Sequence, residues 1–450
     1  QAQAPSPGEA AFRELFKEMV ETDTSAATGD CTALVRKTAA RMTAAGFPTG
    51  QLHIFIPDGA PKAGNLVAVL PGKDPKAKAV LMLGHIDVVN ARREDWVRDP
   101  FAFIEQDGEY YGRGVSDMKA QDAIWADNMI RYAAEGYKPP RTIKMALTCG
   151  EEGGGVVNGA GWLAKNQREL IDAGIALTEG GGGDLDAQGR KLAVTVMAAE
   201  KSGGNFVLET TGPGGHSSKP RQDNIIVSMG QAVANLQRLD FPTELNAFNR
   251  AYFTALAPRV DAEAGAAMRK VLTDPQDPAA NAILNRSVSW RAMMRTTCIP
   301  TLIEGGHAAN AQPQRVRTTI NCRTLPGSPL EPVEAAIVAA VNDPAVKVIG
   351  VNGGPPRPPA PPLTPQMMAP IQAVAAKVFP GVPVTPMQET FGTDSSRLIA
   401  VGIPTYGFSA LFRGDDAGNI HGLNEHISVQ SVMQGREFMY RLIKAYAEQK

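Results

Sequence analysis

The sequence has few cysteines and aromatic residues, almost no net charge and no long hydrophobic run. Its 450 residues include four cysteines, and aromatic side chains make up 6%. Lys plus Arg number 45 and Asp plus Glu 46, so no basic field is present that would hold a nucleic acid or an anionic membrane. No apolar run approaches the roughly eighteen residues that cross a bilayer. We therefore expect no nucleic-acid and no membrane partner, but a small molecule or a peptide.

The cysteines are too few and too scattered for a disulfide framework or a cysteine-type zinc site. We expect buried, small apolar residues at these positions, with a single bridge between Cys298 and Cys322 as the alternative. The positions are Cys31, Cys149, Cys298 and Cys322.

The first residues bear on the cellular compartment. The sequence opens Gln-Ala-Gln-Ala-Pro-Ser-Pro without an initiator Met, and small, alanine-rich residues of this kind remain after a signal-peptidase cut. We expect a periplasmic or secreted protein. A sequence shortened at this end would look the same, and a cytoplasmic protein is the alternative.

The abundant residue types, which are hydrophobic residues, glycine and proline, indicate a folded enzyme with more than one domain. Hydrophobic residues make up 43%, and 45 glycines and 34 prolines are typical of tight turns. Between residues 65 and 178 the pattern alternates between strands and helices, which predicts an α/β sheet with helices on both faces and its chemistry at the carboxyl ends of the strands. The expected elements are strands at 65–70, 79–83, 142–148 and 175–178, and helices at 120–136 and 159–166.

From about residue 200 the order changes to βαββαβ, typical of a compact sandwich. The expected elements are strands at 205–211, 299–304, 315–322 and 346–351, and helices at 225–239 and 332–341. A proline-rich stretch at 355–362 reads as a stiff linker. We therefore predict a discontinuous first domain, 1–201 and 358–450, with a second domain inserted at 202–357. The helical segment 241–294 lengthens the insertion, and its role stays open.

The first two candidate motifs place polar residues just after a strand or before a helix. His85 follows the run Val80–Leu83, and Asp87 lies two residues on, where an extended chain turns both side chains to the same side. Asp87 can then accept from the distal ring N–H of His85. Asp117 follows two glycines and precedes the helix near Ala120. Taken alone, the first motif reads more simply as a structural hydrogen bond and the second as a helix N-cap.

The remaining motifs add carboxylates and a second histidine. Glu151 and Glu152 follow a strand, and two adjacent carboxylates are costly unless cations compensate them, although an exposed acidic turn is the alternative. Glu179 follows another strand, and His421 lies in a turn near the C-terminus. Together the motifs offer two nitrogen ligands and three carboxylates, enough for two four-coordinate zinc ions if one carboxylate bridges them. Glu151 is then left over as a general base.

These motifs, in this order, resemble the di-zinc metallopeptidases of family M20, which include glutamate carboxypeptidase, aminoacylase, succinyl-diaminopimelate desuccinylase and carnosinase-like dipeptidases. The resemblance extends over nearly the whole chain, from Gly84 to His421. It implies an α/β catalytic domain with a mixed, mostly parallel sheet flanked by helices. A smaller, ferredoxin-like βαββαβ domain, which dimerises and acts as a lid, would interrupt it.

The resemblance also assigns metal ligands. Asp117 would bridge two Zn²⁺ ions, Glu152 and His421 would complete one, and His85 and Glu179 the other. Co²⁺ or Mn²⁺ would suit the same ligands, because sites rich in nitrogen and carboxylate oxygen accept several divalent ions.

Further roles follow from the same resemblance. Asp87 would orient His85, Glu151 would take a proton from the attacking water, and the peptide bond between Asp117 and Met118 would be cis.

In the inserted domain, the resemblance suggests that His216 reaches into the partner subunit's site and stabilises the developing oxyanion. Asn310 and Arg323 would bind substrate, often its carboxylate, and Thr393 lies in a loop that would line the pocket. The simpler interpretations are a surface histidine, a loop cap and a solvated arginine.

We therefore predict a homodimeric, metal-dependent hydrolase of an amide or peptide bond in small peptides or N-acyl amino acids. It would be a carboxypeptidase, a dipeptidase or an aminoacylase-like enzyme. The alternative is a metal-dependent binding relative without catalysis, which would have no reason to keep Glu151. The substrate and the native metal stay open.

Overall fold

The computed structural model describes residues 7–351, 358–414 and 416–449. The chain forms two compact units. The first contains the residues up to Ala198, Ala360–Met387 and the residues from Thr393 onward, and the second contains Ala199–Pro359 and Gln388–Gly392. The predicted boundaries lie two or three residues away, and the short segment 388–392 was expected in the first domain. The proline-rich stretch falls partly outside the described residues.

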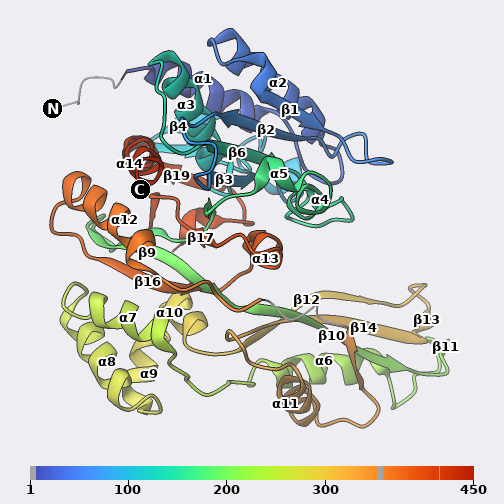
Figure 1. Ribbon diagram of the computed structural model, residues 1–450. Helices are drawn as coiled ribbons and strands as arrows, with labels where there is room; N and C mark the ends of the chain where they lie inside the picture. Colours follow the sequence, from blue (N-terminus) through green and yellow to red (C-terminus); the bar gives the residue numbers. More distant parts are fainter. Residues whose placement is uncertain (1–6, 352–357, 415, 450) are drawn as a thin grey trace. The chain divides into compact units, whose positions relative to one another are not determined.

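The first unit is built on a mixed sheet with a parallel centre, as expected from the sequence (Figure 1). The strand order is β1-β2-β6-β3-β7-β17-β9-β8-β18, with β16 also paired to β9. Strands β6, β3, β7 and β17 are parallel neighbours. The bounds are β1 Leu52–Phe55, β2 Asn65–Leu70, β3 Val80–His85, β6 Ile143–Thr148, β7 Ile175–Thr178, β8 Gly182–Leu185, β9 Lys191–Glu200, β16 Val384–Glu389, β17 Thr405–Gly407 and β18 Phe412–Arg413.

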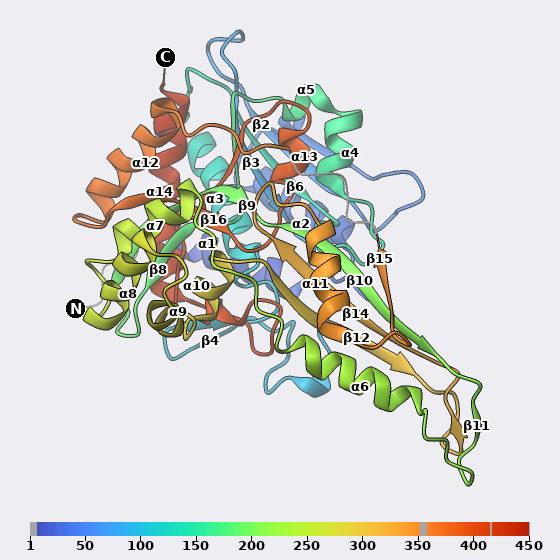
Figure 2. The same ribbon diagram turned by 90° about the horizontal axis from the view of Figure 1, so that it is seen from below.

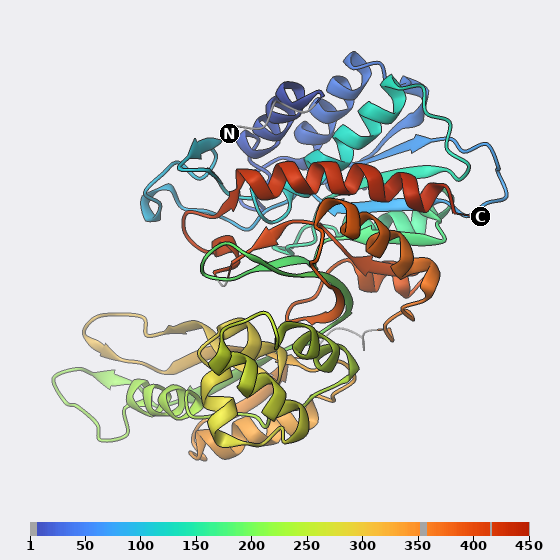
Figure 3. The same ribbon diagram turned by 90° about the vertical axis from the view of Figure 1, so that its left-hand side faces the viewer.

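Helices cover both faces of this sheet, because its central strands are apolar on both sides. Val80 and Met82 face the larger core, whereas Leu81 and Leu83 face the smaller one. The larger core is closed by α1 Glu9–Glu21, α2 Cys31–Ala44, α3 Lys119–Ala134, α12 Pro365–Val378 and α14 Val429–Ala447. The smaller core is closed by α4 Gly159–Asn166, α5 Arg168–Ile171 and α13 Ser395–Ile399. Figure 3 shows α12 and α14 packed side by side.

A small antiparallel sheet, in the order β19-β5-β4, joins distant parts of the chain. Its strands are β4 Ile104–Gln106, β5 Glu109–Tyr111 and β19 His426–Ser428, with His426 opposite Tyr111. The loop after β5 and the loop before β19 therefore start side by side. Short 3-10 helices lie at η1 Thr49–Gln51, η2 Arg93–Asp95 and η3 Ala417–Asn419.

The second unit has the expected βαββαβ order, in an antiparallel sheet β12-β14-β10-β15 (Figure 2). Its strands are β10 Ser202–Thr211, β12 Thr297–Gly305, β14 Arg315–Thr324 and β15 Lys347–Val351. The helices α6 Ile225–Leu236 and α11 Glu331–Val341 pack on it through Met229 and Ile337, against Phe206 and Ile320. A two-stranded antiparallel sheet pairs β11 Gly215–His216 with β13 Ala311–Gln312. The segment 241–294 forms α7 Ala247–Leu256, α8 Ala262–Thr273, α9 Pro278–Leu284 and α10 Val288–Met293.

Each unit contains a disulfide, one of which the sequence did not reveal. Cys298 and Cys322 are bridged, as the alternative interpretation had it, across neighbouring strands. Cys31 and Cys149 are also bridged, so the expectation of unpaired cysteines was wrong. These two residues are 118 positions apart and meet only because α2 packs beside the sheet.

Among the described residues, no helix is long and apolar enough to cross a membrane.

Candidate metal centre

The site begins where neighbouring parallel strands end. His85 is the last residue of β3 and lies in register with Thr148, the last residue of β6. Glu151 and Glu152 follow β6 closely, and Glu179 directly follows β7. Because β6, β3 and β7 are parallel neighbours, their carboxyl ends deliver these side chains to one edge of the sheet.

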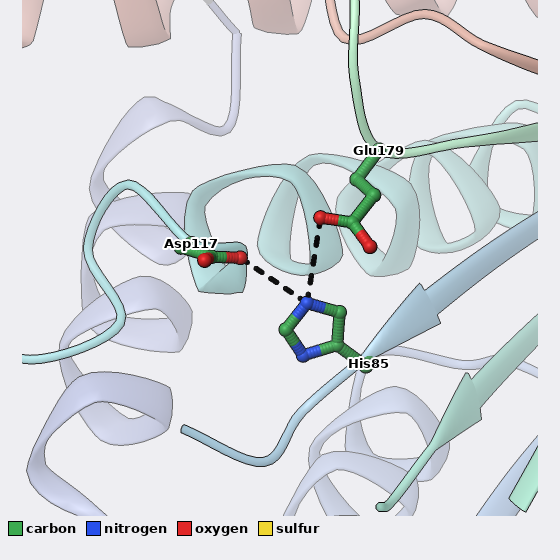
Figure 4. A group of neighbouring side chains, drawn as sticks. All are labelled: His85, Asp117 and Glu179. Atoms are coloured by element: carbon green, nitrogen blue, oxygen red, sulfur yellow. Dashed lines mark hydrogen bonds and ion pairs between the residues drawn. The ribbon is translucent and has the colours of Figure 1, made fainter. Parts of the chain in front are cut away.

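Two groups of candidate metal ligands, called ligand groups below, share Asp117. In the first group, His85 Nε2 lies 3.1 Å from Asp117 Oδ1 and 3.6 Å from Glu179 Oε2 (Figure 4). In the second group, His421 Nε2 lies 3.2 Å from Asp117 Oδ2 and 3.0 Å from Glu152 Oε1. Asp117 thus directs one carboxylate oxygen to each histidine, from the loop that leads into α3. The peptide bond after it, to Met118, is cis.

These distances fit a pair of metal ions. In each group the possible ligand atoms lie within 4.8 Å of one another. A tetrahedral zinc ion with bonds of about 2.0–2.1 Å would place its ligand atoms about 3.3 Å apart, and the separations between the histidine nitrogens and the carboxylate oxygens span 3.0 to 3.6 Å. One nitrogen and two carboxylates in each group leave a fourth position open, as catalytic zinc sites require.

The close carboxylates and histidines of the site shift one another's pKa values. Hydrogen bonds to Asp117 and Glu152 raise the pKa of His421 to about 10. Burial would lower the pKa of His85, but the charge of Glu179 and the hydrogen bond to Asp117 outweigh it and raise that pKa well above its usual range. Burial raises the pKa of Glu179 to about 7. Burial opposes ionisation of Asp117 too, but its bonds with the two histidines hold its pKa well below the usual range.

Glu151 belongs to neither ligand group. Its side chain is only partly exposed, and burial, followed by the negative charge of Glu179, raises its pKa well above the ordinary value. A carboxylate that is not bound to metal but has a raised pKa is suited to accept a proton near neutral pH.

Asp87 is placed differently from the sequence interpretation. The nearer partner of His85 Nδ1 is the main-chain oxygen of Asp87, at 3.0 Å, whereas the carboxylate Oδ1 lies 3.8 Å away. The carboxylate instead accepts the backbone N–H groups of Glu151, at 3.3 Å, and Glu152, at 3.0 Å. Asp87 therefore fixes the loop that carries the two glutamates, and its backbone fixes the histidine ring.

The loop around Thr393 also contains Asp394, a buried carboxylate that sequence reasoning missed. Thr393 is buried, and its hydroxyl accepts the N–H of Ser395 at the start of α13. Its neighbour Asp394 accepts from the Asn158 side chain at 2.6 Å, and burial raises the Asp394 pKa to about 6. Asn158 also donates to the carbonyl of Gly150 at 3.3 Å, so this pair supports the Glu151 loop from the other side. A carboxylate inside a recognised loop motif was the only sequence signal for it.

The other predicted residues belong to the second unit. His216 and Ala311 are paired in the two-stranded sheet of β11 and β13, and the Asn310 carbonyl accepts the N–H of Ser217 at 3.0 Å. His216 and Asn310 are therefore neighbours, and both are exposed. Arg323 lies on β14 and donates from Nε to Asn321 at 3.1 Å. None of the three is part of the carboxylate cluster of the first unit.

Comparison with known proteins places the chain in a family. The model of peptidase family M20/M25/M40 matches residues 81–445. The chain belongs to this family. It is accordingly an M20 metallopeptidase or amidohydrolase, and the resemblance inferred from the motifs is confirmed.

The similar proteins include an N-fatty-acyl-amino acid synthase/hydrolase, an aminoacylase and a dipeptidase. Human N-fatty-acyl-amino acid synthase/hydrolase PM20D1 is 26% identical over 408 residues, which cover 88% of this chain and 80% of that protein. Rat aminoacylase-1A is 26% identical over 390 residues, covering 85% of this chain and 84% of its own length. The crystal structure of human carnosine dipeptidase 1 superposes with a TM-score of 0.71 at 16% identity, covering 98% of this chain and 97% of that one.

Proposed function

We propose that the chain hydrolyses the amide bond of N-acyl amino acids or small peptides, using two divalent metal ions held around Asp117. The observation that carries this proposal is the sharing of one carboxylate between two ligand groups, each with a histidine and a further glutamate. The names of PM20D1 and aminoacylase-1A favour N-acyl amino acids, and that of carnosine dipeptidase 1 favours dipeptides. Zn²⁺ is the proposed ion, with Co²⁺ or Mn²⁺ as substitutes.

The roles of the chain's own residues follow from the contacts. Bound ions would supply Lewis acidity to the scissile carbonyl and the attacking water. Glu151 would take a proton from that water and return it to the leaving amine. Asp87 would keep Glu151 in place through the backbone N–H groups it accepts. Thr393, Asn310 and Arg323 are proposed to line the substrate site.

His216 is proposed as an oxyanion donor supplied by a second copy of the chain. Its Nδ1 accepts the backbone N–H of Ser218 at 3.1 Å, which leaves the proton of a neutral ring on Nε2. A ring in this tautomer can donate from Nε2 to a developing negative charge.

The edge strand β12 is the proposed contact between two copies. It has no partner on its outer side among the described residues, and Ile299, Leu302 and Ile303 on it are 63–68% exposed. An exposed apolar edge strand favours pairing with another chain. Leu302→Glu should give a monomer in analytical ultracentrifugation that keeps its metal but loses amide hydrolysis. A Leu302→Glu dimer with full activity would refute this arrangement.

A periplasmic or secreted location is proposed as well. Disulfides in both units are typical of proteins from oxidising compartments. Fractionation of the source cells, followed by thiol labelling of the native protein, tests this. Free thiols at all four cysteines in a cytosolic fraction would contradict it.

The test of the proposed function separates catalysis from metal binding. Purified protein is assayed on N-acyl amino acids and dipeptides before chelation, after chelation and after Zn²⁺ is restored, with Glu151→Gln and Glu152→Gln as a matched pair. Glu151→Gln should keep both ions but lose about 10²–10⁴-fold in kcat. Glu152→Gln should lose the ion of the second group. Hydrolysis that survives Glu151→Gln would refute the proposed role, and a wild-type chain that binds metal but turns over nothing would favour a binding-only relative.

A further inference from the structure

A buried ion pair outside the ligand groups joins the two loops that carry Asp117 and His421. Glu425 and Arg113 are 0% and 3% exposed, and Arg113 Nη1 donates to Glu425 Oε2 at 2.7 Å. The two residues are 312 positions apart. Because an ion pair so completely removed from water carries a large desolvation cost, its value depends on the further hydrogen bonds that it makes.

The Glu425 carboxylate holds the Asp117 loop. Its Oε2 also accepts the N–H of Gly114 at 3.0 Å, and its Oε1 accepts the N–H groups of Ser116 at 2.8 Å and of Asp117 at 3.0 Å. Glu425 thus fixes the backbone of the proposed bridging ligand itself. Its main-chain oxygen accepts the N–H of Gly112, which continues the pairing of β5 with β19 into the two loops.

Arg113 holds the His421 loop. Its Nη2 donates to the carbonyl of Gly422 at 2.9 Å and, more weakly, to that of His421 at 3.5 Å, while its guanidinium lies over the Trp96 ring. This loop needs external support, because four of its non-glycine residues adopt left-handed backbone conformations that L side chains rarely adopt. They are Ala417, Asn419, His421 and Asn424.

We infer that Arg113 and Glu425 are positioning residues that set the spacing between Asp117 and His421, and with it the affinity for the ion between them. The inference rests on the proposed two-metal function. The pair touches neither a ligand atom of the site nor Glu151; it acts through the backbone of both ligand loops. Residues that orient metal ligands in this way typically change metal affinity by about 10–100-fold.

The test variant is Glu425→Gln, since an amide presents an N–H₂ group to backbone N–H donors that need an acceptor. A matched control exists in the same unit. Arg436 and Asp127 form another buried pair, with Nε 2.8 Å from Oδ2, which joins α14 to α3 away from the ligand loops. Asp127→Asn should lower the urea midpoint as Glu425→Gln does, but only Glu425→Gln should weaken metal binding.

Zn²⁺ affinity is measured by competition with a chromophoric chelator, on folded protein below the urea transition. Wild type and Asp127→Asn should bind two ions with equal affinity, and Glu425→Gln should lose about 10–100-fold in affinity for at least one. If Glu425→Gln does not fold, Arg113→Lys keeps the buried charge, loses the bond to Gly422 and should weaken the ion at His421 more than the other.

Unchanged affinity in the folded variants, or an equal loss in Asp127→Asn, would overturn the positioning role and leave the proposed function intact. A wild-type chain that binds no ions would overturn both.

Discussion

Removal of the Cys31–Cys149 disulfide should destabilise the first unit by several kcal/mol. The bridge closes a loop with a sequence separation of 118, for which the loss of chain entropy in the unfolded state amounts to about 4.9 kcal/mol at 25 °C. At about 2 °C per kcal/mol for a unit of this size, the unfolding temperature should fall by roughly 10 °C. Both cysteines are buried, so the double variant Cys31→Ala and Cys149→Ala avoids placing new hydroxyl groups in the core.

The second disulfide provides the control. Cys298 and Cys322 are only 24 positions apart, which predicts a smaller effect of about 3.5 kcal/mol, confined to the second unit. Thermal unfolding followed by circular dichroism, with metal and after chelation, compares the two double alanine variants with wild type. If the Cys31/Cys149 variant unfolds within about 2 °C of wild type, the entropic reasoning is refuted.

Three further predictions concern the metal site. Asp87→Asn keeps only one acceptor oxygen for two backbone N–H groups and should lower kcat about 10–100-fold with the fold intact; unchanged steady-state kinetics would contradict this. Glu179→Gln should leave the second ligand group able to bind, so metal analysis should find about one ion per chain instead of two. His421, with a pKa of about 10, is protonated at neutral pH and must lose that proton to bind metal. Zn²⁺ affinity should therefore rise at least about tenfold per pH unit between pH 7 and 9 in calorimetric titrations, and a flat profile would count against the protonated apo site.

Much of the fold could be predicted because its signals are local. The apolar run before His85 and the helix after Asp117 read directly as β3 and α3, and the βαββαβ order of the insertion followed from the same periodicities. Strand β9, Lys191–Glu200, was missed although it is buried along almost its whole length, as β3 is. Its second half, Met-Ala-Ala-Glu, consists of residues that favour helices, so the local signal for a strand is weak. The pairing of Cys31 with Cys149 was missed as well, because only tertiary packing brings α2 beside the end of β6.

The candidate site, too, could be predicted only where its signals are local. Its ligands could be proposed because each follows a strand or lies in a glycine-rich turn. The residues that support the ligands could not be predicted, because the sequence does not show whether Glu425 is buried. The four hydrogen bonds that its carboxylate accepts form only when residues 308 to 312 positions apart meet. Asp87 was assigned the wrong partner for the same reason. Its spacing to His85 suggested a hydrogen bond between its carboxylate and the histidine ring, whereas the carboxylate accepts the backbone N–H of Glu151.

Two metal ions around Asp117 are proposed to drive amide hydrolysis. The most direct test of this role is the metal content of the purified chain, determined together with hydrolysis of N-acyl amino acids and dipeptides, for wild type and Asp117→Asn. We predict about two ions per chain in wild type, loss of activity on chelation and recovery with Zn²⁺, and neither full metal content nor activity in Asp117→Asn. A fully active wild-type chain with less than about one ion, or an active Asp117→Asn variant, would contradict the account.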